Sequence, residues 1–397
     1  MRKSIIYLCA CALSGMMVTT SCQDNLDSDA GVSNTRSVNI DKDLFAIKGC
    51  INVKLAKGTN QAIPTTRSGS VEMQSVPSAM TSAMQYSGAY KMERVFKPAG
   101  IYEARTVAEG LDRWYTIYFD NSKDVAAVLD QFKKAEGVEC AERVLPMAKP
   151  TVKMTPYSPS GASMQATPSN FNDPLLAKQW HYYNDGSVNP RAKKGADCNV
   201  KPVWEKYTTG KKNVIVAVVD GGIDITHEDL KDNLYVNEKE KNGQPNVDDD
   251  GNGFVDDIYG YNFVTAKDVV GGTIEPDDGG HGTHVAGTVA ARNNNGKGVA
   301  GIAGGDGSPD SGVRLLSCQI FRNKDEQGDA AAAIKYAADN GAVICQNSWG
   351  YSSNAGVTSM PQSLKEAIDY FIKMAGCDAN GNQRADSPMK GGVVIFA

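Results

Sequence analysis

The chain has 397 residues, enough for two or three domains at roughly 150 residues per domain. Its composition is 41% hydrophobic and 22% charged, which is ordinary for a folded protein and excludes wholesale disorder. The 41 basic and 46 acidic residues give a formal net charge of −5. No basic excess is present to neutralise phosphates, so no nucleic acid is expected as a partner.

Residues 1–21 are predicted to be an export signal peptide. Arg2 and Lys3 precede an apolar run of 14 residues, Ile5 to Val18, which is too short to span a bilayer comfortably. Small residues then lead to Cys22, in a pattern that resembles the lipid-attachment site of a bacterial lipoprotein; ordinary signal cleavage is the alternative. We expect an exported protein, either anchored in the cell envelope by a lipid on Cys22 or secreted.

Nine cysteines occur in the chain, and two of them lie within the predicted signal peptide. The remaining cysteines show no C-x-x-C spacing, which argues against a zinc cluster. Export permits disulfides, but Cys318 and Cys345 lie in apolar, strand-like runs. We expect these two to be small buried side chains.

Residues 22–43 are polar and are predicted to be a tether, followed by a small α+β domain at 44–149. Strands are expected at 44–55, 115–119 and 138–145. A helix is expected at 122–135, because its apolar residues recur at helical spacing. Residues 150–170 carry four prolines and many serines and threonines, which predicts a linker.

From residue 171 to 397 the pattern alternates between strand and helix. The run NVIVAVV at 213–219 is continuously apolar and β-branched, which is typical of a strand buried on both faces. Strand–helix alternation predicts a doubly wound, mostly parallel α/β sheet, whose ligands gather at the carboxyl ends of the strands. The further strands are expected at 314–321, 342–346 and 392–397, and the further helices at 328–340 and 360–375.

Two titratable residues occupy positions that favour chemistry in such a fold. Asp220 directly follows the first buried strand, where it either faces the ligand crevice or caps a loop. His281 begins the predicted buried helix HGTHVAGT at 281–288 and is flanked by glycines. A zinc site at His281 and His284 is the weaker alternative, because the H-E-x-x-H spacing is absent.

These segments resemble the subtilisin-like (S8) serine protease family. The segment VVDGGID at 218–224 is similar to the family's aspartate motif, except that Gly221 stands where Ser or Thr is usual. The segment HGTHVAGT matches the family's histidine motif residue for residue, and CQNSWG at 345–350 resembles its substrate-binding strand. The resemblance covers about 171–397 and implies the subtilisin-like fold.

The resemblance implies a serine endopeptidase that acts on protein or peptide substrates. His281 would be the general base and Asp220 would orient its imidazole, in the chain order of subtilisins. Ser348, Trp349 and Gly350 would bind substrate backbone as an extended edge; the alternative for Trp349 is simple packing.

The nucleophile and the oxyanion donor of the family are not found in this sequence. No Gly-Thr-Ser-Met-Ala-type motif occurs, and Ser348 does not match it. We therefore expect a peptidase domain that is incomplete at its C-terminus and inactive by itself. The alternative is a non-catalytic surface binding protein, or a pseudogene product, on a protease-like scaffold.

An acidic loop at 248–257 suggests a structural calcium ion. Oxygen-bearing side chains alternate around a glycine, as in the first half of an EF-hand loop; a solvated acidic loop is the alternative. The expected ligands are Asp248, Asp250 and Asn252, closed by Asp256 or Asp257. The resemblance also suggests a second calcium position at Asp229 and Asn294.

The position of residues 44–149, ahead of a linker and a peptidase domain, resembles that of a propeptide. The family resemblance implies that such a domain covers the active-site edge and assists folding. An independent adhesion or spacer domain is the alternative.

Overall fold

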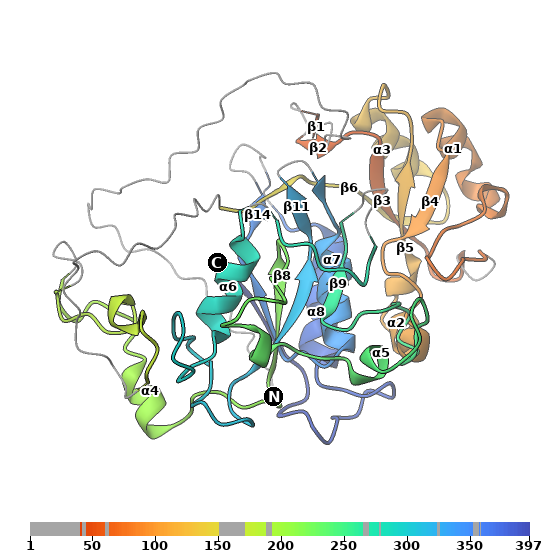
Figure 1. The fold of residues 1–397 in the computed structure, drawn as a ribbon. Helices are drawn as coiled ribbons and strands as arrows, with labels where there is room; N and C mark the ends of the chain where they lie inside the picture. Colours follow the sequence, from red (N-terminus) through yellow and green to blue (C-terminus); the bar gives the residue numbers. More distant parts are fainter. Residues whose placement is uncertain are drawn as a thin grey trace, which may run out of the picture. The chain divides into compact units, whose positions relative to one another are not determined.

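A five-stranded parallel sheet forms the centre of the C-terminal part of the chain (Figure 1). Its order is β15-β13-β8-β10-β9, with all registers parallel. The strands are β8 (Ile215–Asp220), β9 (Gly260–Asn262), β10 (Arg314–Gln319), β13 (Ile344–Asn347) and β15 (Val393–Phe396). This confirms the predicted α/β class and the predicted central strand.

The computed structural model describes residues 40–41, 45–59, 63–150, 171–187, 193–264, 270–277, 279–323, 326–351, 357 and 359–397. All of them belong to one unit, Arg36–Ala397. The predicted signal peptide, Cys22 and almost all of the predicted linker lie outside the described residues. In the part of the chain that is described, no helix has the length and apolar character needed to cross a membrane.

Helices cover both faces of the parallel sheet. Along β8, Val216 and Val218 pack with helix α6 (His281–Ala290), whereas Ala217 and Val219 pack with helices α7 (Ala330–Asp339) and α8 (Gln362–Met374). Because successive strand residues point to opposite faces, the unbroken apolar run is buried on both sides. Short helices α4 (Lys201–Lys206) and α5 (Glu238–Lys241) lie in the connections.

The N-terminal domain is an antiparallel sheet with helices against it, as predicted. The order is β4-β5-β3-β6, and α1 (Thr81–Ser87) and α3 (Val125–Lys134) bury their apolar faces on it. The strands are β3 (Cys50–Leu55), β4 (Lys91–Arg94), β5 (Trp114–Tyr118) and β6 (Val138–Arg143). Helix α2 (Glu103–Ala108) follows β4 in the chain.

The predicted strand at 44–55 is wrong as one element, because the structure divides it. Strand β2 (Ala46–Ile47) pairs with β1 (Ile40–Asp41), and β3 begins only at Cys50. The turn between them contains Gly49, whose φ is +80°. A Cβ there would also lie 1.9 Å from Oδ1 of Asn121, so only glycine fits this turn.

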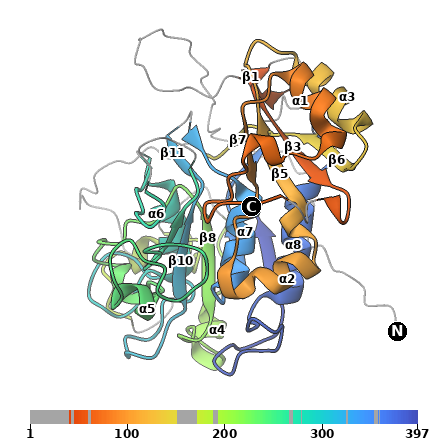
Figure 2. The same cartoon turned by 90° about the vertical axis from the view of Figure 1, so that its right-hand side faces the viewer.

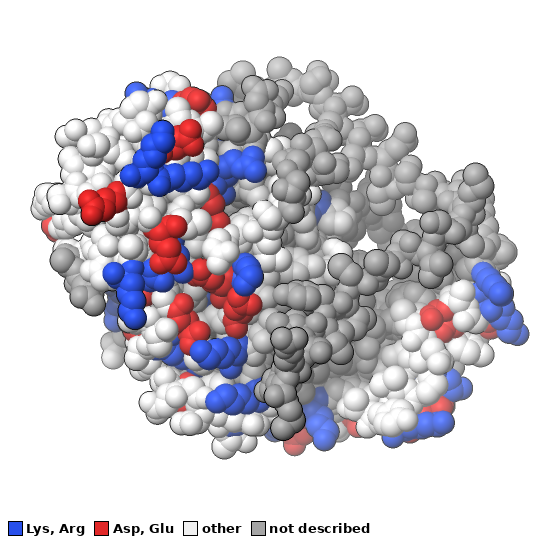
Figure 3. Space-filling model, turned by 180° about the vertical axis from the view of Figure 1, so that it is seen from behind, with Lys and Arg blue, Asp and Glu red and all other residues white. Residues whose placement is uncertain are grey.

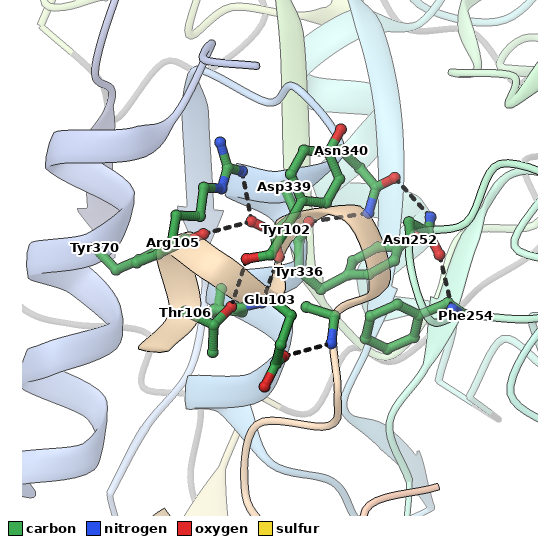
Figure 4. A network of polar contacts seen from close by, with 12 residues as sticks. Tyr102, Glu103, Arg105, Thr106, Asn252, Phe254, Tyr336, Asp339, Asn340 and Tyr370 are labelled. Carbon is green, nitrogen blue, oxygen red and sulfur yellow. Dashed lines mark hydrogen bonds and ion pairs between the residues drawn. The ribbon is translucent and has the colours of Figure 1, made fainter. Parts of the chain in front are cut away.

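Several polar groups join the N-terminal domain to the peptidase-like part, and Figure 2 shows helix α2 of that domain beside α8. Glu366 on α8 accepts from Lys54 Nζ at 2.7 Å and from Trp114 Nε1 at 2.8 Å. Arg105 on α2 forms a buried ion pair with Asp339, the last residue of α7 (Figure 4). The two parts are therefore joined by specific, desolvated contacts as well as by the chain itself.

Candidate active site

Asp220 and His281 meet at the carboxyl edge of the parallel sheet. Asp220 is the last residue of β8 and His281 is the first of α6. Nδ1 of His281 lies 2.8 Å from Oδ1 and 3.0 Å from Oδ2 of Asp220. Both residues are buried, so water does not compete for this contact.

Glycine allows the helix to start so close to the strand. A Cβ on Gly282 would lie 2.4 Å from the carbonyl oxygen of Gly222. Gly222 itself has a φ of +86°, which a residue with a side chain rarely adopts. The glycines of the two motifs thus bring the carboxylate and the imidazole together.

The geometry suits a base whose tautomer is fixed by the carboxylate. A hydrogen bond from Nδ1–H to Asp220 leaves Nε2 to accept a proton. The catalytic roles of Asp220 and His281 stay predictions, since the contact gives the geometry of the pair and not its activity. Among the described residues, no hydrogen bond joins Nε2 of His281 to a serine hydroxyl.

The predicted substrate-binding residues form an extended edge beside the sheet. Strand β14 (Gly350–Tyr351) pairs antiparallel with β7 (Met147–Ala148), the last strand of the N-terminal domain. The register places Gly350 opposite Ala148. An extended segment of this same chain therefore lies where the resemblance places a peptide substrate.

The two residues that precede Gly350 differ in their surroundings. The Trp349 indole is 4% exposed and packs edge-on against Tyr351 and Phe396, so the packing role left open by the sequence is observed. The Ser348 hydroxyl accepts a hydrogen bond from Gln346 at 2.9 Å.

The acidic loop gathers three carboxylates, of which the sequence predicted two. Oxygens of Glu240, Asp250 and Asp257 all lie within 4.8 Å of one another. Burial raises the pKa of each, and that of Asp257 reaches about 8. Glu240 was missed because it belongs to the charged run EKEK at 238–241, which reads as a solvated helix face.

The other predicted ligands of this loop mainly hold its backbone. Asp248 accepts from the amides of Gly251, Asn252 and Gly253. Asp256 accepts from the amide of Asn246 and lies outside the group of three. The Asn252 side chain donates to Asp257 at 2.9 Å, so it borders the carboxylates.

Asp229 and Asn294 are engaged in separate loop contacts. The Asp229 oxygens accept from Asn295 Nδ2 at 2.7 Å and from the Val299 amide at 2.9 Å. The Asn294 side chain donates to the carbonyl of Asp306 at 3.1 Å. The second calcium position at Asp229 and Asn294 stays a prediction.

A buried aspartate–histidine pair at the carboxyl edge of a parallel α/β sheet is an arrangement that hydrolases with a catalytic triad use to orient a general base. The model of the subtilase family matches residues 211–395, and the model of the N-terminal part of that family matches residues 51–186. The chain belongs to the subtilase family. It is by family a subtilisin-like serine peptidase that is preceded by a propeptide-like region.

Two curated relatives match this chain over part of their length. Subtilisin-like protease 1 of Plasmodium falciparum is 34% identical over 166 residues, which cover 41% of this chain and 22% of that protein. Protease KEX1 of Kluyveromyces lactis is 32% identical over 220 residues, covering 53% and 23%. A solved protease structure from Pseudoalteromonas arctica is 27% identical, with a TM-score of 0.35, and covers 57% of this chain and 58% of that one. This chain spans less than a quarter of the length of the two curated relatives.

Proposed function

We propose that this protein is an exported subtilisin-type endopeptidase whose substrate groove is occupied by its own N-terminal domain. The observation that carries the proposal is the pairing of β7 with β14 beside the Asp220–His281 pair. Antiparallel backbone pairing of this kind recognises an extended peptide with little regard to its sequence. Proteins or peptides are thus the proposed substrates, and the N-terminal domain is the proposed inhibitor.

The nucleophile is proposed to come from sequence outside these 397 residues. The printed sequence contains no Gly-Thr-Ser-Met-Ala-type motif. An imidazole base without a nucleophilic hydroxyl does not complete acyl transfer. The 397-residue chain is therefore expected to show no peptidase activity by itself.

The test compares this chain with the full product of its gene. A fluorophosphonate probe should label the full product at a serine, and the His281→Ala variant should lose the labelling. Peptide turnover by the 397-residue chain that disappears in His281→Ala would contradict the proposed incompleteness. A correctly folded full product that neither labels nor cleaves casein would support the non-catalytic binding protein instead.

A structural calcium ion is proposed at the acidic loop, held by Glu240, Asp250 and Asp257. Carboxylate oxygens are the ligands that this hard cation prefers, and three carboxylates this close repel one another without it. The cation would rigidify the loop and supply no chemistry. Asp248 and Asp256 would shape the loop through their backbone contacts.

Thermal unfolding tests the calcium proposal. Calcium at about 100 times its Kd should stabilise the chain by about 2.7 kcal/mol, and Asp257→Asn should remove this effect. Asp229→Asn serves as the comparison, because Asp229 belongs to the other predicted position. Calcium stabilisation that persists in Asp257→Asn and disappears in Asp229→Asn would overturn the placement.

Membrane attachment through a lipid on Cys22 is also proposed, on sequence grounds alone. Metabolic labelling with an alkyne fatty acid should mark the wild-type protein and leave Cys22→Ser unmarked. Equal labelling of both, or none of either, would leave ordinary secretion as the supported route.

A further inference from the structure

Asp277 places a buried carboxylate next to the catalytic pair. Its Oδ1 accepts from the backbone N of His281 at 3.2 Å, and its own backbone N donates to the carbonyl of Gly221 at 2.8 Å. The side chain is 2% exposed. Its Oδ2 is also buried and makes no hydrogen bond within the described structure; its charge partner is Nζ of Lys149, with which it forms an ion pair.

The glycine at position 221 makes room for this arrangement. A Cβ at Gly221 would lie 2.0 Å from Oδ2 of Asp277, so any side chain there would displace the carboxylate. The sequence departs from the usual family motif at this same position, where Ser or Thr is expected. With glycine at position 221, the Asp277 carboxylate keeps its place and its Oδ2 pairs with Nζ of Lys149.

Lys149 reaches Asp277 from the strand that lies in the substrate position. Ala148 pairs with Gly350 on β14, and Lys149 is the next residue. Its side chain is 16% exposed and runs to a carboxylate that is almost fully desolvated. If this strand left, Oδ2 would lose the cation that now neutralises it, and the Asp277 carboxylate would keep only the contact of its Oδ1 with the His281 amide among the contacts described here.

We propose that Asp277 is the anionic end of a subsite that binds a lysine or arginine side chain of an extended peptide. The cation would belong to the residue that follows the one paired with Gly350. The inference rests on the proposed endopeptidase function and adds a specificity to it. Lys149 is then a substrate-like occupant of the subsite, supplied by the N-terminal domain.

A first measurement requires no catalysis and uses the 397-residue chain. Lysines are acetylated at neutral pH and their rates are read by mass spectrometry. Lys149 should react at least about tenfold more slowly than the exposed Lys133, and Asp277→Asn should abolish most of that protection. Lys54, paired with Glu366 and 7% exposed, reports on folding, because it stays protected only in a folded variant.

A second measurement uses the full gene product and a set of fluorogenic peptides. These differ only in carrying lysine, arginine or norleucine at the position that follows the residue paired with Gly350. The kcat/KM ratio of lysine to norleucine should be roughly 10 to 100, the size expected for a charge-assisted hydrogen bond in a desolvated site. Asp277→Asn should reduce this ratio to near one.

The outcomes distinguish a failure of the proposed subsite from a failure of the proposed endopeptidase function. A lysine-to-norleucine ratio near one in the wild type, or a ratio unchanged by Asp277→Asn, overturns the subsite even though the enzyme is active. If the full product cleaves nothing, the proposed function fails and the acetylation experiment decides the subsite: equal rates for Lys149 and Lys133 overturn it. If Asp277→Asn does not fold, as rapid acetylation of Lys54 would show, Gly221→Ser replaces it in both measurements, with the same expected losses.

Discussion

The buried Arg105–Asp339 contact provides a quantitative test of how the N-terminal domain is held. Nη2 of Arg105 lies 2.5 Å from Oδ1 of Asp339, and Nη1 donates to the carbonyls of Asp378 at 2.8 Å and Cys377 at 3.2 Å. The guanidinium also stacks on the Tyr102 ring, 4.3 Å from its centroid (Figure 4). The perturbation is Arg105→Met, which keeps the apolar stem and removes the charge.

The expected cost follows from what remains around Asp339. Removing one partner of a buried pair costs about 3–5 kcal/mol. Here the carboxylate keeps Lys335 at 2.6 Å and the Tyr370 hydroxyl at 2.7 Å, so its charge stays compensated. We therefore expect Arg105→Met to lower the free energy of unfolding by about 2–3 kcal/mol. Asp339→Asn should cost more, since it leaves two buried cations without their carboxylate.

Urea unfolding followed by tryptophan fluorescence gives the global effect, and hydrogen exchange of the α2 amides gives the local one. The control is Lys201→Ala, which removes an exposed ion pair with Glu205 and should cost at most about 0.5 kcal/mol. The reasoning would be refuted if Arg105→Met lowered the free energy of unfolding by no more than about 0.5 kcal/mol and left the exchange of the α2 amides unchanged. The Arg105–Asp339 contact would then not stabilise the attachment of the N-terminal domain.

Three further predictions follow from single positions. The carboxylate of Asp329 caps α7 by accepting from the Ala332 amide at 2.7 Å, so Asp329→Ala should cost about 1 kcal/mol in thermal unfolding; no loss would exclude the cap. Trp114→Phe keeps an aromatic ring at this buried position, but it removes the donor to Glu366 and leaves space where the larger indole packed. We expect a loss of at least about 1–2 kcal/mol, which an unchanged unfolding curve would contradict. Burial raises the pKa of the Cys345 thiol to about 12, so the thiolate fraction is small at pH 8 and increases as the pH rises. Iodoacetamide mapping should find Cys345 unmodified while the exposed Cys198 reacts. Equal labelling of the two cysteines in the folded protein would refute the burial of Cys345.

The sequence predicted those elements whose burial is purely apolar. The β-branched run of β8 and the helical spacing of the apolar residues in α3 both indicate which side chains are buried. Strand β4 and helix α2 were missed, since each carries an arginine that is almost fully buried: Arg94 is 8% and Arg105 is 4% exposed. A charged side chain reads as solvent-facing unless its partner is known, and Asp339 lies 234 positions away from Arg105.

For the same reason, the sequence predicted the Asp220–His281 pair of the site but not Asp277. Asp220 and His281 could be predicted because one ends a buried strand and the other starts a glycine-flanked helix. Asp277 lies only four positions before His281, yet nothing local marks it as different from a surface aspartate. Its position depends on Gly221 and on a strand of the N-terminal domain, and both relations exist only in the folded chain.

Three ion pairs across the domain contact have the same polarity, and this bears on the proposed mechanism. Three cations of the N-terminal domain, Lys54, Arg105 and Lys149, pair with three carboxylates of the peptidase-like part, Glu366, Asp339 and Asp277. On the described part of the face in Figure 3, charged side chains of both signs are interspersed.

Departure of the N-terminal domain would affect these carboxylates unequally. Asp339 would keep Lys335, and the Glu366 side chain is already 17% exposed to water. Asp277 would lose Lys149, which among the described residues is the only charge partner of its Oδ2. It lies in the proposed substrate groove, where an incoming cationic side chain would take the place of Lys149. Release of the N-terminal domain would thus uncover the groove and, in the same step, free Asp277 to select a substrate with a cationic side chain.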